Sequence, residues 1–307
     1  MKNVLAVAAV IVACTASIAA QWPTFTESGV PRDKQGRVVM DAPAPRTADG
    51  KPDLSGHWLR ADPEPLPPEI AGIVGDREGQ GGRGGRPPGI PLEPTVAPFP
   101  PDPKSPPVAT FFELGGNIKG GLPFTPWAAA IRKTRQTADA KDNPDANCMP
   151  MGITQFHMQP QPRKIIQTPK VTLILYEANY GLRTIYTDGR TLPKQGEPQP
   201  FWYGYSVGRW EGNDFVVETN NLRGAEDGPF DGWLDVRGSP YSQQAKFTER
   251  FRRPMFGKLE IDITVDDAKA YTKPFTVRIN QRVTVDDEMI EFVCNENQQF
   301  RRRVKID

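Results

Sequence analysis

From about residue 163 onward, hydrophobic and polar residues alternate with a period of two, the pattern of β-strands that bury one face. In residues 259–266 every second position is Leu, Ile or Val, and the positions between them are charged or hydroxylated. Residues 275–285 alternate in the same way. One wet face and one buried face are typical of antiparallel sheets.

The predicted strands are short, and turn signals such as Asp188-Gly189 and Asp286-Asp287 lie between them. They cover residues 53–60, 163–168, 171–176, 182–187, 203–210, 215–219, 245–252, 259–266, 275–285 and 289–295. Because they follow one another without intervening helices, we predict an all-β fold built as an antiparallel meander. Closing the meander into a barrel removes the exposed edges, so a barrel is favoured over a β-sandwich.

The first half of the chain contains one predicted short helix, over residues 125–140. Thr125 suits its N-cap, and Pro126 suits its first turn. Residues 61–124 are rich in Pro and Gly and bury too little apolar surface to offset the entropy of ordering, so we expect a long insertion there. Residues 21–52 form an N-terminal extension, 53–60 the first strand and 148–307 a β-rich barrel domain.

The amino terminus is typical of an export signal. Lys2 precedes an apolar stretch at residues 4–13, and small residues follow up to Ala20. We expect residues 1–20 to be a signal peptide and the protein to be periplasmic or secreted. Ile11-Val12-Ala13-Cys14 also resembles a lipobox. Lipidation of Cys14 would make the protein an outer-membrane lipoprotein, and only then would a membrane be its partner.

Composition narrows the choice of partners and cofactors. The chain has 38 Lys and Arg against 37 Asp and Glu, so it lacks the basic surplus that nucleic-acid partners require. Its two histidines exclude multi-His zinc sites, and we expect neither a metal site nor a cofactor. Cys148 and Cys294 remain after export, and an even number of cysteines in an oxidising compartment favours a disulfide.

Two resemblances bear on this interpretation. Gly56-His57-Trp58 in the first strand resembles the Gly-x-Trp motif of lipocalin-like (calycin) barrels. In those proteins the Trp closes one barrel end and packs under an arginine from a late strand. The resemblance implies a lipocalin-like barrel, with Arg301, Arg302 or Arg303 as the expected partner of Trp58.

The second resemblance covers roughly residues 45–297. The matching segments are RTADGKPDLSGHW (46–58), FTPW (124–127), QTP (167–169), LYE (175–177), DGR (188–190), SVGRWEG (206–212), TER (248–250), YTKP (271–274) and CNEN (294–297). They are similar to a family of exported bacterial proteins of unknown function, common in acidobacteria and proteobacteria. The resemblance implies kinship and export but no particular chemistry. The family often carries histidines near residue 233, where this chain has Ser239-Pro240-Tyr241-Ser242, so no imidazole role carries over there.

Two glutamates are candidates for interior acid or base groups. Alternation places Glu249 on a face that two phenylalanines bury, and places Glu177 on the face of the leucines before it. An inward carboxylate costs several kcal/mol unless it is paired, so we expect partners among Arg183, Arg209 and Arg250. The cluster either forms a structural ion pair at the barrel floor, or binds and protonates a ligand.

Residues 201–235 are dense in aromatic side chains, which give large stacking areas at low entropic cost. Tyr203, Tyr205, Trp210 and Trp233, together with Arg183, are therefore our candidate ligand-binding residues. The alternative is that these rings pack the core or the rim of the barrel.

His157 is the third candidate catalytic residue, beside Glu249 and Glu177. It lies near Met149, Met151 and Met158, so it could act as a general base, as a copper(I) ligand or as an axial haem ligand. No ligand spacing marks any of these roles, and a structural histidine is favoured.

The sequence therefore predicts an exported β-barrel that binds a small hydrophobic or aromatic molecule. One alternative is a periplasmic hydrolase, lyase or isomerase that uses Glu249 or Glu177 as acid or base, with Arg183 and Tyr203 placing the substrate. The other is an outer-membrane lipoprotein with a structural role. Both the binding protein and the enzyme require that the barrel encloses a cavity, an enclosed hollow that could hold a small molecule.

Overall fold

The computed structural model describes residues 25–61, 102–197 and 199–294 of the chain. The predicted signal peptide, Cys14, most of the predicted insertion and Arg301–Arg303 lie outside these residues. Within them, no helix has the length and apolar character needed to cross a membrane.

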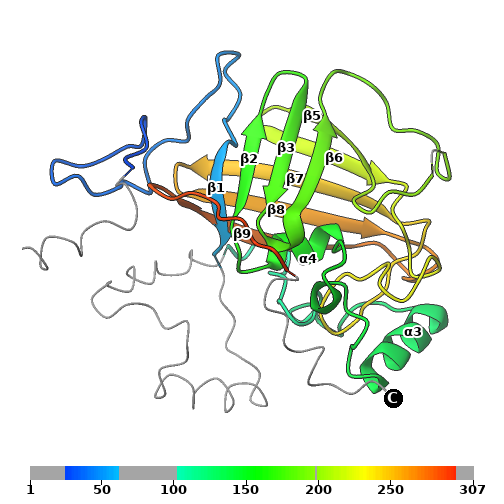
Figure 1. The fold of residues 1–307 in the computed structure, drawn as a ribbon. Helices are drawn as coiled ribbons and strands as arrows, with labels where there is room; N and C mark the ends of the chain where they lie inside the picture. Colours follow the sequence, from blue (N-terminus) through cyan, green and yellow to red (C-terminus); the bar gives the residue numbers. More distant parts are fainter. Residues whose placement is uncertain (1–24, 62–101, 198, 295–307) are drawn as a thin grey trace, which may run out of the picture.

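Nine strands close into one barrel in the order of the chain, which confirms the predicted all-β barrel (Figure 1). They are β1 Gly56–Arg60, β2 Arg163–Gln167, β3 Val171–Tyr176, β4 Gly181–Tyr186, β5 Tyr205–Glu211, β6 Asp214–Asn220, β7 Lys246–Met255, β8 Lys258–Asp266 and β9 Phe275–Thr284. The strand predicted at 289–295 does not form within the described residues. Residues 285–294 instead make an irregular segment, the C-terminal strap, drawn in red in Figure 1.

The meander is interrupted once, because β4 and β5 pair in parallel while every other neighbouring pair is antiparallel. An odd number of strands that otherwise alternate in direction cannot close a ring without one parallel pair. The connection from the end of β4 to the start of β5, described at residues 187–197 and 199–204, takes the place of a hairpin. This seam is short, with Ile185 opposite Ser206 and Tyr186 opposite Val207.

The predicted helix forms as α3, Pro126–Thr137, which lies outside the barrel (Figure 1). The Thr125 side chain accepts a hydrogen bond from the backbone N–H of Ala128 at 3.3 Å, as an N-cap does. The helix stops before the predicted residue 140, since Asp139 and Ala140 adopt left-handed backbone angles.

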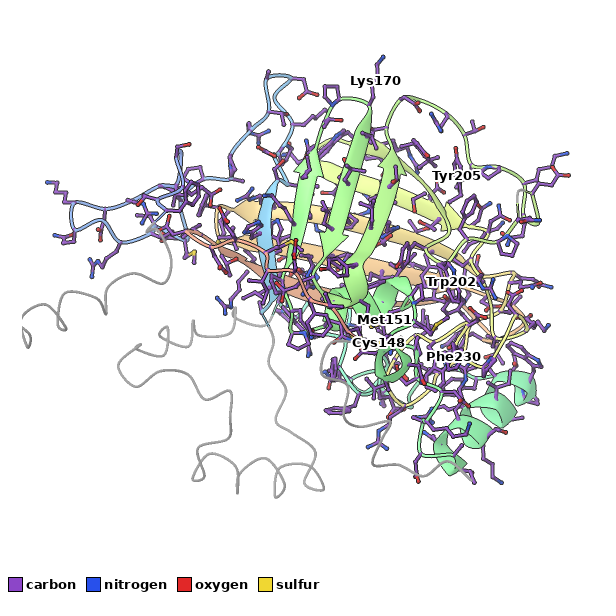
Figure 2. The ribbon with its side chains drawn as sticks, in the orientation of Figure 1. Cys148, Met151, Lys170, Trp202, Tyr205 and Phe230 are labelled. Atoms are coloured by element: carbon purple, nitrogen blue, oxygen red, sulfur yellow. A yellow bond between two sulfur atoms is a disulfide. The ribbon has the colours of Figure 1, made fainter. Side chains whose placement is uncertain are left out.

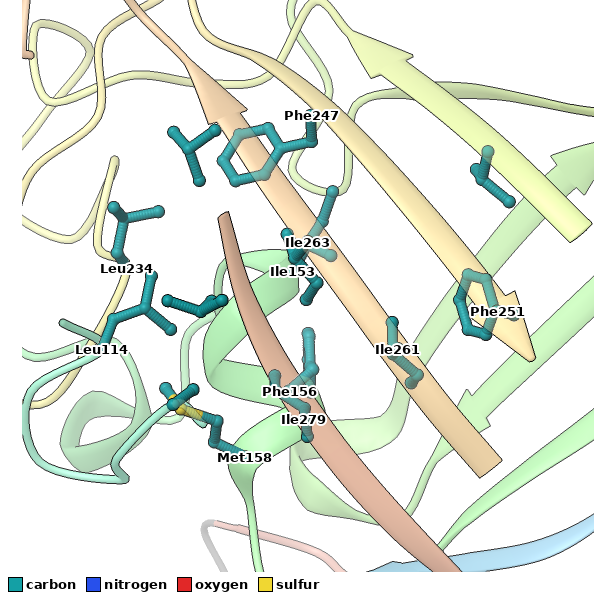
Figure 3. Packing of buried hydrophobic residues seen from close by; sticks show 14 of the residues in the cluster. Leu114, Ile153, Phe156, Met158, Leu234, Phe247, Phe251, Ile261, Ile263 and Ile279 are labelled. Carbon is teal, nitrogen blue, oxygen red and sulfur yellow. The ribbon is translucent and has the colours of Figure 1, made fainter. Parts of the chain in front are cut away.

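A second helix, α4 (Ile153–Met158), was not anticipated. All of its residues are buried, so it lacks the one-sided pattern by which helices are recognised in a sequence. Figure 3 shows its Ile153, Phe156 and Met158 beside side chains of β7, β8 and β9. Two short 3₁₀ turns, η1 (Asp145–Asn147) and η2 (Ala178–Tyr180), lie near it in the chain.

The described end of the predicted insertion packs on the barrel. Ala109 donates its backbone N–H to the carbonyl of Arg278 in β9 at 2.8 Å, and Leu114 joins the hydrophobic core. Residues 102–124 are therefore part of the folded unit and not a linker.

Within the described residues, an arginine from β7 packs on Trp58, while Arg301–Arg303, the expected partners, lie outside them. The guanidinium carbon of Arg253 lies 4.7 Å from the centre of the Trp58 ring, and Trp58 Nε1 donates to the carbonyl of Leu54 at 3.0 Å. Arg253 also donates to the carbonyls of Asp53 and Ser55. It therefore ties β7 to the entry of β1.

The predicted disulfide is present. Cys148 and Cys294 are bonded, with their Cα atoms 5.6 Å apart. The bond fixes the end of the C-terminal strap to the segment between η1 and α4, so the strap is anchored at the end of the barrel that α4 closes.

Candidate functional site

The barrel interior contains an ion pair formed by Glu249 of β7 and Arg183 of β4. Glu249 lies between Phe247 and Phe251 on the inward face of β7, as the alternation predicts. Arg183 points inward from β4 and binds both carboxylate oxygens. Its Nη1 donates to Oε1 at 2.9 Å, and its Nη2 contacts Oε2. Bidentate pairing of this kind is the strongest arrangement of these two groups.

Two hydroxyl groups complete the binding of the Arg183 guanidinium. Ser206 of β5 accepts from Nε at 3.2 Å, and Thr219 of β6 accepts from Nη2 at 2.9 Å. The two hydroxyls also hydrogen-bond each other at 2.8 Å. Strands β4 to β7 thus each contribute one polar side chain to the same point. The sequence analysis did not select Ser206 and Thr219, although both occupy inward positions of predicted strands.

His157 reaches this pair from α4. Its Nε2 lies 3.0 Å from Glu249 Oε1, and the Tyr176 hydroxyl is 3.5 Å from the same nitrogen. An ionised carboxylate only accepts hydrogen bonds, so Nε2 carries the imidazole proton and Nδ1 is left as an acceptor. Nδ1 is buried and has no hydrogen-bond partner among the described residues.

The backbone around His157 is fixed by two further interior side chains. Arg163 of β2 donates to the carbonyls of His157 at 2.5 Å and Gln159 at 2.7 Å. Gln281 of β9 donates to the His157 carbonyl at 3.0 Å. These bonds satisfy backbone carbonyls at the C-terminal end of α4, for which the helix itself offers no N–H donor. The helix is thereby held as a plug at this end of the barrel.

Burial and charge act in opposite directions on the two ionisable partners of Arg183. Burial alone would raise the pKa of Glu249, but the charge of Arg183 and hydrogen bonds from His157 and Arg183 lower it to about 2. Burial lowers the pKa of His157, which keeps the imidazole neutral. At neutral pH, Glu249 therefore has no proton to donate and is a weak base.

The polar centre is also closed to solvent. Glu249 is 0 % exposed, His157 1 % and Arg183 2 %. A side chain without accessible area borders no void large enough to admit a water molecule. The interior around the pair is filled by the protein's own side chains, contrary to the premise of an enclosed hollow. In this conformation a substrate cannot reach Glu249.

Glu177 lies elsewhere, which corrects its predicted place inside the barrel. The inward residues of β3 are Thr172, Ile174 and Tyr176, so the predicted register of this strand is off by one residue. Glu177 follows the end of the strand, where its Oε2 accepts the backbone N–H of Ile290 at 3.3 Å. Burial raises its pKa. It anchors the C-terminal strap and is separate from the interior pair.

The structure does not bring the five candidate ligand-binding residues to one place. Arg183 lies at the barrel centre, and Tyr203 contacts Phe156 of α4 with ring centres 5.4 Å apart. Trp210 packs on Phe215, and Trp233 is buried under Arg135 of α3. These contacts span 5.1 Å between the ring centres of Trp210 and Phe215, and 4.2 Å from the Arg135 guanidinium carbon to the Trp233 ring. Trp210 and Trp233 thus fit the packing alternative.

Tyr205 belongs to a group that we call the seam cluster, formed by Tyr186, Arg190, Phe201 and Tyr205. Phe201 and Arg190 are exposed, and the two tyrosines are half-buried. The rings of Tyr186 and Tyr205 are 5.3 Å apart between centres, and those of Phe201 and Tyr205 are 6.1 Å apart. Arg190 lies 3.8 Å above the Tyr186 ring and donates to the Tyr205 hydroxyl at 3.0 Å. Figure 2 shows Tyr205 beside the crossing loop. The cluster lies at the parallel seam.

A groove of about 360 Å³ lies on the outside of the barrel, between the N-terminal extension and β7–β8. Its lining includes Arg46, Asp214, Arg252 and Glu260. Arg252 and Asp214 already contact each other at 3.5 Å, and the groove has no aromatic wall. Its chemistry does not match the predicted hydrophobic ligand.

The described residues contain no group of three or more His, Cys, Asp and Glu side chains arranged to hold a metal ion. Two of the three methionines considered as copper ligands pack in the hydrophobic core. Met151 and Met158 are buried in the core, and His157 Nε2 is bonded to Glu249.

Comparison with protein-family models, with curated proteins and with solved structures finds no match to this chain, so the resemblance to the exported bacterial family stays a prediction.

Proposed function

We propose that the protein is an exported, non-catalytic binding protein that takes a small aromatic or hydrophobic molecule at the seam cluster. The observation that carries the proposal is the contrast between a sealed interior pair and a cluster of contacting rings that reaches the surface at the seam, where Phe201 is exposed. An enzyme that used Glu249 as acid or base would need this carboxylate to be accessible and to have a pKa raised towards neutral pH. Glu249 has neither property.

The seam cluster has the features of a stacking site. Phe201 is 43 % exposed, and its ring meets Tyr205, which in turn meets Tyr186. Arg190 fixes both tyrosines, so the rings are ordered before a ligand arrives and lose little entropy on binding. A flat aromatic molecule can extend this stack. Export rests on the signal-like amino terminus.

Titration of the full chain with N-phenyl-1-naphthylamine, an apolar aromatic dye whose emission rises on binding, tests this function. We expect Phe201→Ala and Tyr205→Ala to weaken dye binding by at least about tenfold, as loss of a stacking ring does at other aromatic sites. Phe25→Ala removes a ring elsewhere that is even more exposed than Phe201, and it should leave binding unchanged.

A Phe156→Ala variant distinguishes the seam cluster from the barrel interior, because it removes a ring of the plug. Dye binding that survives both seam variants and rises in Phe156→Ala would contradict the surface site and restore the interior one. Native mass spectrometry of protein from its own host would identify a retained ligand.

A further inference from the structure

Strands β2, β3 and β4 present an apolar face to the outside of the barrel. Along this face Ile166 stands opposite Leu173, and Leu175 stands opposite Leu182. Leu182 is 53 % exposed and Ile166 36 %. We call these four residues the apolar face; β2 and β3, which carry three of them, lie on the front wall of the barrel in Figure 1. Two polar side chains lie in the same outward rows: Lys164 of β2 stands opposite Leu175, and Thr184 of β4 stands opposite Leu173.

The apolar face continues onto η2 and the C-terminal strap. Tyr180 of η2 is exposed beside Leu182, and Ile290 and Val293 are exposed on the strap. The backbone of Ile290 is bonded to Glu177, the residue before η2. Five of the seven large hydrophobic side chains that are exposed in the described residues therefore gather on this side.

The opposite wall of the barrel is charged. On the outside of β6, β7, β8 and β9, Arg250 pairs with Asp214 at 3.0 Å and Arg278 pairs with Asp262 at 2.6 Å. The same barrel thus covers one wall with ion pairs and leaves another apolar. An apolar patch on an otherwise charged surface marks an interaction site.

We propose that the apolar face is the interface between two copies of this chain, related by a twofold axis. Charge supports this occupant. Lys170 is exposed at the β2–β3 turn (Figure 2), while Glu288 and Glu291 are exposed on the strap at the other end of the face. A twofold axis that lies in the interface and runs perpendicular to the strands brings opposite ends of the two faces together, and so places Lys170 of each copy against the acidic strap of the other. An anionic lipid surface would repel that strap, so a membrane fits the face less well.

Sedimentation of the full chain at micromolar concentrations tests the proposal. We expect a dimer for the parent chain, and a dissociation constant at least about tenfold higher for Leu182→Glu, since the substitution places a charge in the middle of the interface. Phe25→Glu makes the same kind of change at an exposed residue outside the face and should remain dimeric. A monomeric parent chain, or a Leu182→Glu variant as dimeric as the parent, would overturn the proposal.

Charge reversal tests the twofold arrangement itself. Lys170→Glu alone should weaken the dimer, because it opposes the acidic strap of the other copy. Adding Glu291→Lys in the same chain should restore dimerisation, since the reversed pair attracts again. If the double variant is weaker than both single variants, the proposed arrangement is wrong. Dye binding at the seam cluster should persist in all these variants, so the two proposals fail independently.

Discussion

Glu249 and Arg250 are neighbours in β7 but lie in different electrostatic environments. Glu249 points inward and forms one closed pair with Arg183, both of them almost without solvent contact. Arg250 points outward and pairs with Glu211 at 2.8 Å and Asp214 at 3.0 Å, with 35 % of its side chain exposed. The chemical groups are the same inside and outside, so the difference between the two clusters is one of burial and of the number of partners.

In the outer network the arginines and Asp214 have more than one oppositely charged partner, whereas Glu249 and Arg183 in the inner pair depend on each other. Asp214 contacts both Arg250 and Arg252, and Arg252 also contacts Asp262, so each charge keeps a partner when one is removed. Water and salt screen what remains. Inside, Glu249 is the only carboxylate that the structure places against Arg183, within the described residues. Loss of either member leaves a buried charge uncompensated.

The largest effect is expected for Glu249→Leu. The substitution leaves the Arg183 guanidinium buried without a counter-charge, which costs about 3–5 kcal/mol. Urea unfolding followed by circular dichroism measures the loss. A destabilisation below about 1 kcal/mol would place the inner pair in the same class as the exposed ones.

The double variant Arg183→Met/Glu249→Leu should be more stable than Glu249→Leu alone and should recover more than half of its loss. Two apolar side chains of similar volume leave no charge to compensate. Ser206 and Thr219 keep their mutual hydrogen bond. Equal stabilities of the single and double variants would show that the unpaired charge is not the cause.

A smaller effect is expected from pH through His157. Burial holds its pKa below the ordinary value of 6.5, so below that pH the unfolded chain binds a proton that the folded chain does not. Stability should therefore fall between about pH 7 and pH 5, and His157→Gln should flatten this dependence. Glu249 acts in a separate window, because its contribution is lost only as pH falls from its ordinary 4.5 towards about 2.

His57→Gln is the control variant for His157→Gln. Burial also lowers the pKa of His57, but this imidazole is not bonded to the interior pair. Urea unfolding of both variants at pH 7 and pH 5 compares them. An unchanged slope in His157→Gln would mean that another group titrates in this window.

The smallest effect is expected for Arg250→Ala. Because Asp214 keeps Arg252 nearby, the loss should be at most about 1 kcal/mol and should shrink further in 1 M salt. A salt-independent loss as large as that of Glu249→Leu would remove the distinction between the two clusters.

The same contrast explains what could be predicted from the sequence. Where one face of a strand is charged, as in β7 and β8, alternation identifies the inward residues and predicts the place of Glu249. Its partner could not be predicted beyond a choice among three arginines, and the structure selects Arg183. In β3 both faces are apolar, since Leu173 and Leu175 belong to the apolar face and Ile174 to the core. The pattern therefore cannot tell inside from outside, and Glu177 was misplaced by one residue.

Position along the chain was a poor guide to the ligand site. The aromatic residues between 201 and 235 are close in sequence, but the chain there crosses from the β4 end, forms β5 and β6, and then runs out towards α3. Their rings consequently reach the plug, the seam, the core and the helix. The plug itself was missed because α4 is buried on all sides, so its polar residues Gln155 and His157 carry no periodic signal.

The parallel seam has a consequence for how the chain folds. It is the one parallel contact in an otherwise continuous antiparallel sheet, which runs from β5 to β9 and, through the β9–β1 pair, on to β4. The ring is completed only when the short β4–β5 contact forms and when His57 meets Thr284 from the far end of the sequence. Contacts between such distant residues are slow to form, because a long loop must first be closed. Ring closure at these two contacts is therefore the expected rate-limiting step of folding.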